Sequence, residues 1–257
     1  MGFLTELTRD LRARLAAQPI DEGSLSDLLE GAPPVRDLTS ALTADPPAVV
    51  AEVKRSSPSA GIIAAGADPA DRARAYVGGG AAAVSVLTEP SHFGGSLADL
   101  DAVRTAVTLP VLRKDFLVLP VQVREARAHG ADAILLITAC LSDGELAEML
   151  AVSRSLGMET VVEAHDDVDL ERAFETGARV IGVNARDLES LEVDVEAALG
   201  RLRRIPVDRV AVLESGVSTR SQVLRAEAAG ASGILVGEVL MRTDDPAATI
   251  RELRGAT

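Results

Sequence analysis

Cysteine and aromatic residues are scarce in this chain of 257 residues. The single cysteine, Cys140, excludes a disulfide framework within the chain and a zinc site built from cysteines. Tryptophan is absent and aromatic residues make up 2% of the chain, so small aliphatic side chains must pack the core. With 47% hydrophobic residues, a chain of this length can bury a sizeable core and fits a single α/β barrel.

Long apolar runs and positive charge are also missing. No stretch is long enough to span a membrane, and the N-terminus, "MGFLTELTRDLRARL", lacks the apolar run of a signal peptide. Together with the lone cysteine, this leads us to expect a cytoplasmic protein. The net charge of −13 disfavours nucleic-acid binding, so an anionic ligand would need a local group of basic residues. No apolar stripe for a partner stands out, and we expect a monomer.

Lysine is almost absent as well: Lys54 and Lys114 are the only lysines among 26 basic residues, and the rest are arginines. Arginine stays protonated, whereas a lysine in apolar surroundings can have its pKa lowered and act as an acid or a base. We therefore interpret both lysines as functional groups. The alternative is that they form structural ion pairs with Glu52 and Asp115.

Eight short, nearly continuous apolar runs recur along the chain, a pattern typical of parallel strands buried on both faces. Helical patterns lie between them, and several end in glycine. This alternation predicts an α/β fold, a (β/α)8 TIM barrel, rather than a doubly wound sheet. The expected strands are 48–54, 82–88, 110–116, 131–137, 160–164, 179–185, 209–215 and 233–238.

We expect two parts: an N-terminal helical extension, residues 1–47, and the barrel catalytic domain, residues 48–257. The extension carries an apolar helical face, so it should pack on the barrel. We expect it to matter more for ligand binding than for folding. That face is formed by Phe3, Leu4, Leu7, Leu11 and Leu15.

Polar residues cluster where the expected strands end, which is where such barrels place their chemistry. A solvated rim would explain one of them more easily than the whole set. The loops after the last two strands also carry glycines, at the position where this fold commonly binds phosphate, and "SSPS" adds hydroxyls. The polar set is Glu52, Lys54, Lys114, Asp115, Glu163, Asn184, Arg186, Glu214, Ser215, Gly216, Gly237 and Glu238. In "EAHDD", residues 163–167, the donors are sequential, so we expect no metal site.

These motifs together resemble the indole-3-glycerol phosphate synthase family. The matching stretches are "AEVKRSSPSAG", "SVLTEPSHFGGS", "PVLRKDF", "GADAILLI", "VVEAHD", "IGVNARDLESLEVD", "LESGV" and "LVGEVLMRTDDP". The resemblance implies closure of the pyrrole ring of 1-(2-carboxyphenylamino)-1-deoxyribulose 5-phosphate with loss of carbon dioxide and water. It implies a phosphorylated small-molecule substrate and neither cofactor nor metal. Ala60 departs from the family, which commonly has lysine there.

The resemblance also implies roles for individual residues. Lys114 would be the general acid of ring closure, Glu163 the acid–base group of dehydration, and Lys54 the partner of the anthranilate carboxylate. Four residues would orient the substrate: Glu52, Asn184, Arg186 and Glu214. The phosphate would lie against Ser57, Ser215, Gly216, Gly237 and Glu238. The apolar wall for the aromatic ring would be Phe93, Phe116, Leu135, Leu188 and Val236.

Two other functions remain possible from the sequence. Another phosphate-binding barrel, such as a phosphosugar isomerase, would favour Asp, or Cys with Asp, as its acid–base pair. Lysines at the ends of the first and third strands argue against it. A non-catalytic paralogue is disfavoured because Lys114, Glu163 and Asn184 are all present.

Overall fold

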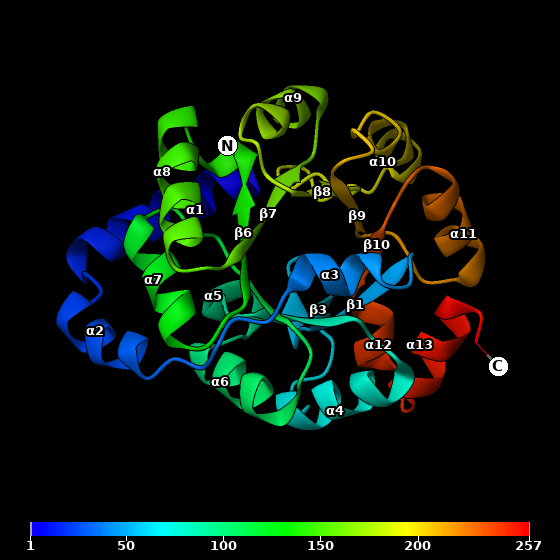
Figure 1. Cartoon of the computed structure of the whole chain (residues 1–257), viewed down its shortest axis with the longest axis horizontal. Helices are drawn as coiled ribbons and strands as arrows, with labels where there is room; N and C mark the ends of the chain where they lie inside the picture. The colour runs from blue at the N-terminus through cyan, green and yellow to red at the C-terminus, as the bar shows by residue number, and fades with distance from the viewer. Residues whose placement is uncertain (1, 257) are drawn as a thin grey trace.

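Eight parallel strands form a closed barrel in the computed structural model, which describes residues 2–256 (Figure 1). The strands are β1 (Ala48–Val53), β4 (Ala83–Leu87), β5 (Val111–Lys114), β6 (Ala133–Ile137), β7 (Glu159–Ala164), β8 (Val180–Asn184), β9 (Val210–Glu214) and β10 (Gly233–Val236). Their order around the barrel is β1-β10-β9-β8-β7-β6-β5-β4, so the last strand closes on the first. The predicted (β/α)8 barrel is confirmed, with each strand inside its expected range or within one residue of it.

A ring of helices surrounds the barrel and buries the outer face of each strand. Polar side chains start several of these helices: Asp68, Ser96 and Ser142 each accept a hydrogen bond from a backbone N–H in the first turn. The outer helices are α4 (Pro69–Gly79), α6 (Leu97–Ala106), α7 (Pro120–Ala128), α8 (Asp143–Ser155), α9 (Asp167–Glu175), α10 (Val195–Leu202), α11 (Arg220–Ala228) and α13 (Pro246–Arg254). None of the helices in residues 2–256 has the length and apolar character needed to cross a bilayer.

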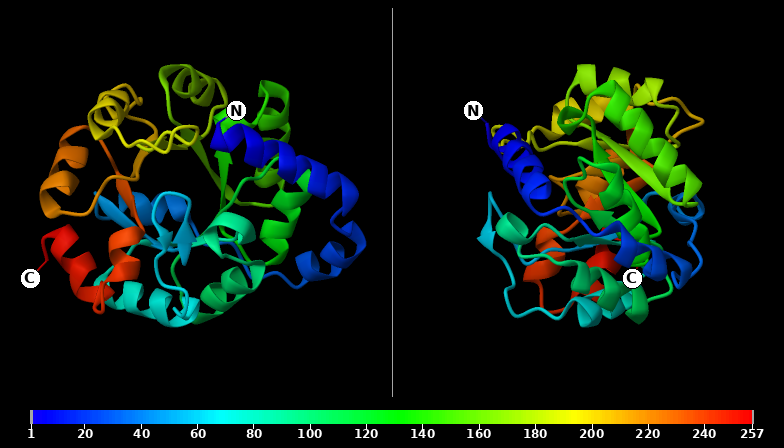
Figure 2. Two further views of the ribbon diagram at one scale, coloured as in Figure 1. Left: turned by 180° about the vertical axis from the view of Figure 1, so that it is seen from behind. Right: turned by 90° about the vertical axis from the view of Figure 1, so that its left-hand side faces the viewer.

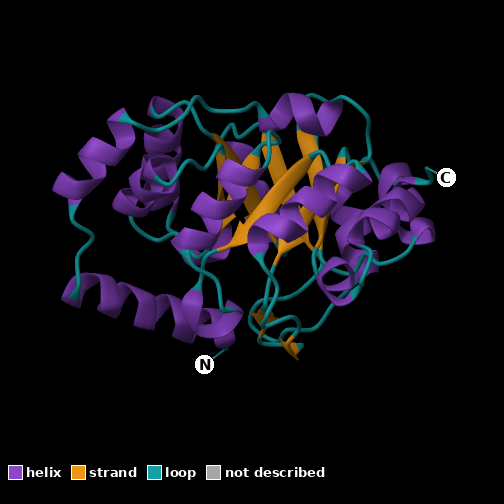
Figure 3. Cartoon of the chain, turned by 90° about the horizontal axis from the view of Figure 1, so that it is seen from below, coloured by secondary structure: helices purple, strands orange, loops and turns teal. Residues whose placement is uncertain are grey.

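Five short elements in the loops after the strands were not predicted from the sequence. They span two to five residues each, too few to show a periodic pattern. They are the hairpin β2 (Ser56–Ser57) and β3 (Gly61–Ile62), and the helices α5 (Pro90–Phe93), η1 (Thr138–Cys140) and α12 (Glu238–Arg242). In Figure 3 the hairpin lies at the same end of the barrel as the N-terminal helix.

That N-terminal helix, α1 (Phe3–Ala17), lies over the carboxyl ends of the strands (Figure 2). Its Phe3 ring packs edge-on against His92, with 5.1 Å between the ring centroids. Arg12 donates hydrogen bonds to the carbonyl oxygens of Val118 and Cys140, each at 3.4 Å. Since these partners follow β4, β5 and β6, α1 joins three loops of the same rim.

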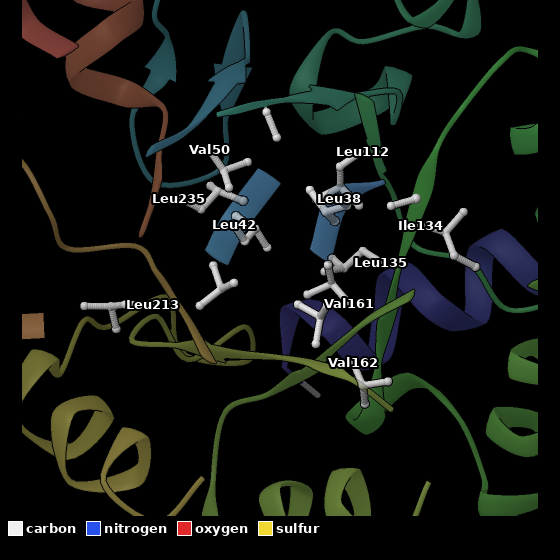
Figure 4. Close-up of a cluster of buried hydrophobic side chains, with 14 of the residues drawn as sticks. Leu38, Leu42, Val50, Leu112, Ile134, Leu135, Val161, Val162, Leu213 and Leu235 are labelled. Atoms are coloured by element: carbon white, nitrogen blue, oxygen red, sulfur yellow. The ribbon is translucent and has the colours of Figure 1, made fainter. Parts of the chain in front are cut away.

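The rest of the extension reaches the opposite end of the barrel. Helix α2 (Glu22–Glu30) leads to α3 (Leu38–Thr43), which lies across the amino ends of the strands. Figure 4 shows Leu38 and Leu42 among the inward side chains of the barrel, and both are at most 1% exposed. Thr39 also donates a 2.7 Å hydrogen bond to Glu159, the first residue of β7. α3 is therefore part of the barrel core, and the expectation that the extension matters more for ligand binding than for folding stays a prediction.

We predict that Leu42→Ala lowers the free energy of unfolding by about 2–5 kcal/mol, the usual cost of truncating a fully buried leucine. Leu28→Ala on α2 is the matched control, because Leu28 is 48% exposed and should change stability by less than about 0.5 kcal/mol. Urea unfolding followed by circular dichroism measures both. Equal costs for the two variants would show that α3 does not close the barrel.

Candidate active site

One cavity of about 450 Å³ opens at the carboxyl ends of the strands. Its walls come from all eight strands of the barrel together with the loops that follow the strands. All the residues that the sequence and the resemblance singled out as catalytic, substrate-binding or phosphate-binding line this cavity. The geometry therefore brings together side chains that are up to 186 positions apart in the chain, from Glu52 to Glu238.

Lys114 lies at the centre of the charged groups. It ends β5, and its Nζ atom donates to Glu214 Oε2 at 2.9 Å and to Glu163 Oε2 at 3.3 Å. The side chain of Lys114 is 16% exposed, whereas those of its two partners are at most 2% exposed. These partners come from β7 and β9. Neither is Asp115, the partner considered in the alternative of a structural ion pair.

The charge of Lys114 is favoured by these carboxylates. Burial alone would lower the pKa of the ammonium group, but the negative charges of Glu214, Glu163 and Glu52 outweigh it and raise the pKa above its ordinary value. The expectation that apolar surroundings lower this pKa is therefore wrong, because the sequence does not reveal the carboxylates across the barrel. These carboxylates therefore favour the ammonium form of Lys114.

The carboxyl group of Glu214 has a higher pKa than a normal surface carboxyl group. Burial raises the pKa of its carboxyl group to about 8, an effect that Lys114 opposes and Glu163 reinforces. A carboxyl group with a pKa near neutrality can exchange protons at physiological pH. The site thus pairs a charged lysine with a carboxyl group that can take up or release a proton.

Glu163 is fixed by contacts on both sides. Asn184 Nδ2 donates to Glu163 Oε1 at 3.2 Å, while Lys114 occupies the other carboxylate oxygen. Thr138 Oγ1 donates to the backbone carbonyl of Glu163 at 2.8 Å. Because Glu163 is 1% exposed and each oxygen has a donor, its carboxylate has one defined orientation toward the cavity.

The other lysine has a simpler environment. Lys54 Nζ lies 2.7 Å from Glu52 Oε1, two residues earlier on the same strand, so this pair is the structural ion pair considered from the sequence. Its side chain is 19% exposed and lines the cavity. A cation at the wall of an otherwise acidic chain can attract the carboxylate of a ligand.

The loops after β9 and β10 form the end of the cavity where glycines predicted an anion site. Ser215 and Gly216 have φ angles of 65° and 75°, so two successive left-handed residues turn the chain sharply at the end of β9. A Cβ atom on Gly216 would lie 2.6 Å from Val195, which makes glycine necessary for packing as well. Gly237 precedes α12. Within residues 2–256, the Ser57 hydroxyl contacts only its own loop, where it accepts from Ala60 N at 3.1 Å and lies 3.4 Å from the Ser59 hydroxyl.

Apolar side chains line the remaining wall. The rings of Phe93 and Phe116 lie 6.1 Å apart between centroids and are tilted by 43°. Leu135, Leu188 and Val236 complete the wall that the resemblance implied. Sequence reasoning missed further wall residues, Leu87, Ile137, Leu191 and Arg242; the first two end strands β4 and β6, a signal that could have identified them.

Some polar residues of the strand ends and loops serve the structure instead. Asp115 borders the cavity, but its Oδ2 atom is paired with Arg113 Nη2 at 3.0 Å. His165 Nδ1 lies 3.0 Å from the carbonyl oxygen of Asn184. Cys140 is buried, which raises the pKa of its thiol to about 12 and leaves it a poor nucleophile.

Comparison with known proteins extends the resemblance over the whole chain. Residues 4–253 match the family model of indole-3-glycerol phosphate synthase. The chain is 49% identical to the indole-3-glycerol phosphate synthase of Micrococcus luteus, with 100% of this chain and 98% of that protein covered. It is 48% identical to the protein of the same name from Mycobacterium avium, with 97% and 93% covered.

Among solved structures, 3-hexulose-6-phosphate synthase gives a TM-score of 0.62 at 17% identity, covering 81% of this chain and 98% of that one. A tryptophan synthase α-subunit from Pyrococcus furiosus gives 0.61 at 18% identity, covering 81% and 98%. These two likenesses show the barrel fold. The family model and the relatives show more: this chain belongs to the indole-3-glycerol phosphate synthase family.

Proposed function

We propose that the chain closes the pyrrole ring of 1-(2-carboxyphenylamino)-1-deoxyribulose 5-phosphate, the reaction of its family in tryptophan biosynthesis. It is then a carboxy-lyase, and its substrate is a phosphorylated small molecule. The observation that carries the proposal is Lys114, held charged between Glu163 and Glu214 in a cavity with an apolar wall. We propose further that it acts as a monomer in the cytoplasm.

Ring closure begins when the aromatic ring carbon attacks the ribulose carbonyl carbon. Negative charge then builds on the carbonyl oxygen, and the Lys114 ammonium donates its proton there, giving a hydroxyl group. Glu214, whose carboxyl pKa is about 8, can return a proton to the lysine. The carboxylates of Glu52 and Glu163 stabilise the positive charge that develops on the substrate nitrogen. Carbon dioxide then leaves, and the electron pair of the broken bond between the ring and the carboxylate returns to the ring.

Dehydration follows at the same carbon. The new hydroxyl leaves as water after it receives a proton from Glu163, while the lone pair of the ring nitrogen helps to expel it. Glu163 first takes that proton from Lys114 through their 3.3 Å contact. Asn184 keeps the carboxyl group in position through its 3.2 Å hydrogen bond. The Glu163 carboxylate then removes a proton from the new ring, which restores aromaticity, and solvent returns to Glu214 the one proton consumed overall.

Binding groups hold the two ends of the substrate. Lys54 and Arg186 supply positive charge for the anthranilate carboxylate, and the aromatic ring lies against Phe93, Phe116 and their apolar neighbours. The phosphate lies at the loops after β9 and β10, against Ser215, Gly216, Gly237 and Glu238, with Ser57 opposite. A phosphosugar isomerase is less well supported because Lys114 joins two carboxylates from different strands.

Lys114→Arg should lower kcat by about 10²–10⁴-fold, the range for losing one acid–base group. A guanidinium keeps the charge but does not release its proton. Lys54→Arg is the matched control, because only charge is required there: KM should rise modestly while kcat stays within about threefold. Indole fluorescence during turnover measures both. A Lys114→Arg enzyme within a few-fold of wild type would leave the lysine only an electrostatic role.

Glu163→Gln removes the ionisable group at nearly constant shape and should reduce kcat by about 10²–10⁴-fold with little change in KM. Its control is Glu159→Gln on the same strand, whose carboxylate binds Thr39 at the far end of the barrel. That variant should lose some stability and keep its kcat. If Glu163→Gln turns over at the wild-type rate, Glu163 has no part in proton transfer.

Inorganic phosphate should compete with the substrate, raising the apparent KM without changing kcat, since it fits only the phosphate end of the cavity. Sodium chloride at matched ionic strength controls for screening of charges. Initial rates at several phosphate concentrations make the measurement. A change in kcat alone, or no inhibition beyond that of chloride, would contradict the phosphate assignment. A Gly216→Val variant is a poor test, because it also strains the backbone and displaces Val195.

A further inference from the structure

Gly182 occupies an inward position of the barrel that carries no side chain. It lies in β8, paired with Glu163 of β7 on one side and with Val212 of β9 on the other. A Cβ atom at Gly182 would lie 2.3 Å from Glu214 Oε1 and 3.2 Å from Val161 Cγ1. The first contact is far below van der Waals distance, so the carboxylate of Glu214 fills the space that any other residue would occupy.

Packing against the backbone of β8 limits the position of this half of the Glu214 carboxylate, which also lies beside Glu163. Oε2 accepts from Lys114 at 2.9 Å, whereas Oε1 is buried and has no hydrogen-bond partner among the described residues. The side chain is 1% exposed. The position of Oε1 therefore depends on the open space above Gly182, and the position of Oε2 beside Lys114 depends on it in turn.

The backbone does not require glycine at this position. Gly182 does not have a positive φ angle. It lies in the regular strand β8, where every other residue carries a side chain. An alanine there is compatible with the strand, so its effect would come from the added methyl group alone. Gly237 repeats the arrangement for another carboxylate: its Cβ would lie 2.4 Å from Glu52 Oε1.

We propose that Gly182 is a positioning residue. Because it has no side chain, the Glu214 carboxylate can stay within hydrogen-bond distance of Lys114. The expected loss of kcat rests on the proposed function. The expected displacement of Glu214 rests on geometry alone. A methyl group at Gly182 pushes the carboxylate toward the cavity, which Glu214 lines, because Val161 closes the other side. Lys114 then loses its shorter ion pair and the substrate loses space.

The test is a cycle of Gly182→Ala, Glu214→Asp and the double variant. In the wild-type background Gly182→Ala should lower kcat on the order of 10²-fold, the cost of displacing a reacting group by about 1 Å. An aspartate places its oxygens near the present position of Glu214 Cδ, which is 3.4 Å from the added Cβ, an ordinary contact. In the Glu214→Asp background, the same glycine substitution should therefore change kcat by less than about threefold.

An equal loss in both backgrounds would overturn the proposal, because a general structural defect does not depend on the side chain at position 214. Gly233→Ala is the matched control: this inward glycine of β10 meets Leu42 at 3.1 Å and no carboxylate, so its kcat should stay near wild type. Should Gly182→Ala fail to fold, the double variant decides. Recovery of a cooperative thermal transition with Glu214→Asp supports the proposal, and failure in both refutes it.

A crystal structure of Gly182→Ala separates this inference from the proposed function. If wild-type protein shows no turnover, the proposed function fails, but the structure still tests the geometry. We expect the distance from Lys114 Nζ to the nearest Glu214 oxygen to exceed hydrogen-bond range. A distance unchanged from 2.9 Å would overturn the positioning role.

Discussion

The site depends on one constraint: three glutamates are buried beside two lysines at the centre of a barrel made from small aliphatic residues. A buried carboxylate is costly unless a cation or donor lies within reach. Lys114 meets that need for Glu163 and Glu214, and Lys54 meets it for Glu52. The same pairing keeps Lys114 charged, so the interaction that makes the burial tolerable also prepares the proton donor.

The two ends of the barrel meet this constraint in different ways. At the amino ends of the strands, Leu38 and Leu42 of α3 fill the interior and close it with apolar packing. At the carboxyl ends, the interior carries the charged groups, and α1 joins the surrounding loops through Phe3 and Arg12. Stability is thus concentrated at one end, and the other is left open for a ligand, as is typical of this fold.

The barrel and the members of the site could be predicted from the sequence, because apolar runs mark strands and polar residues mark their ends. The partners could not. Lys114 contacts residues 49 and 100 positions away, and strand periodicity gives a side chain its face but not its neighbour across the barrel. Asp115, adjacent in sequence, pairs with Arg113 instead. The sequence likewise could not predict that Gly182 leaves space for Glu214, since a glycine in a strand is by itself consistent with a bulge or a bend.

The charge state of Lys114 tests the account most directly, and the near absence of lysine makes it measurable. In protein labelled with ¹⁵N-lysine, Lys54→Arg leaves a single Nζ signal, and a pH titration by NMR follows it. The account predicts that the ammonium form of Lys114 is still the major one at about pH 10.4, the ordinary pKa of a lysine side chain. A midpoint clearly below that value would contradict the claim that Glu163 and Glu214 hold Lys114 as a shared cation.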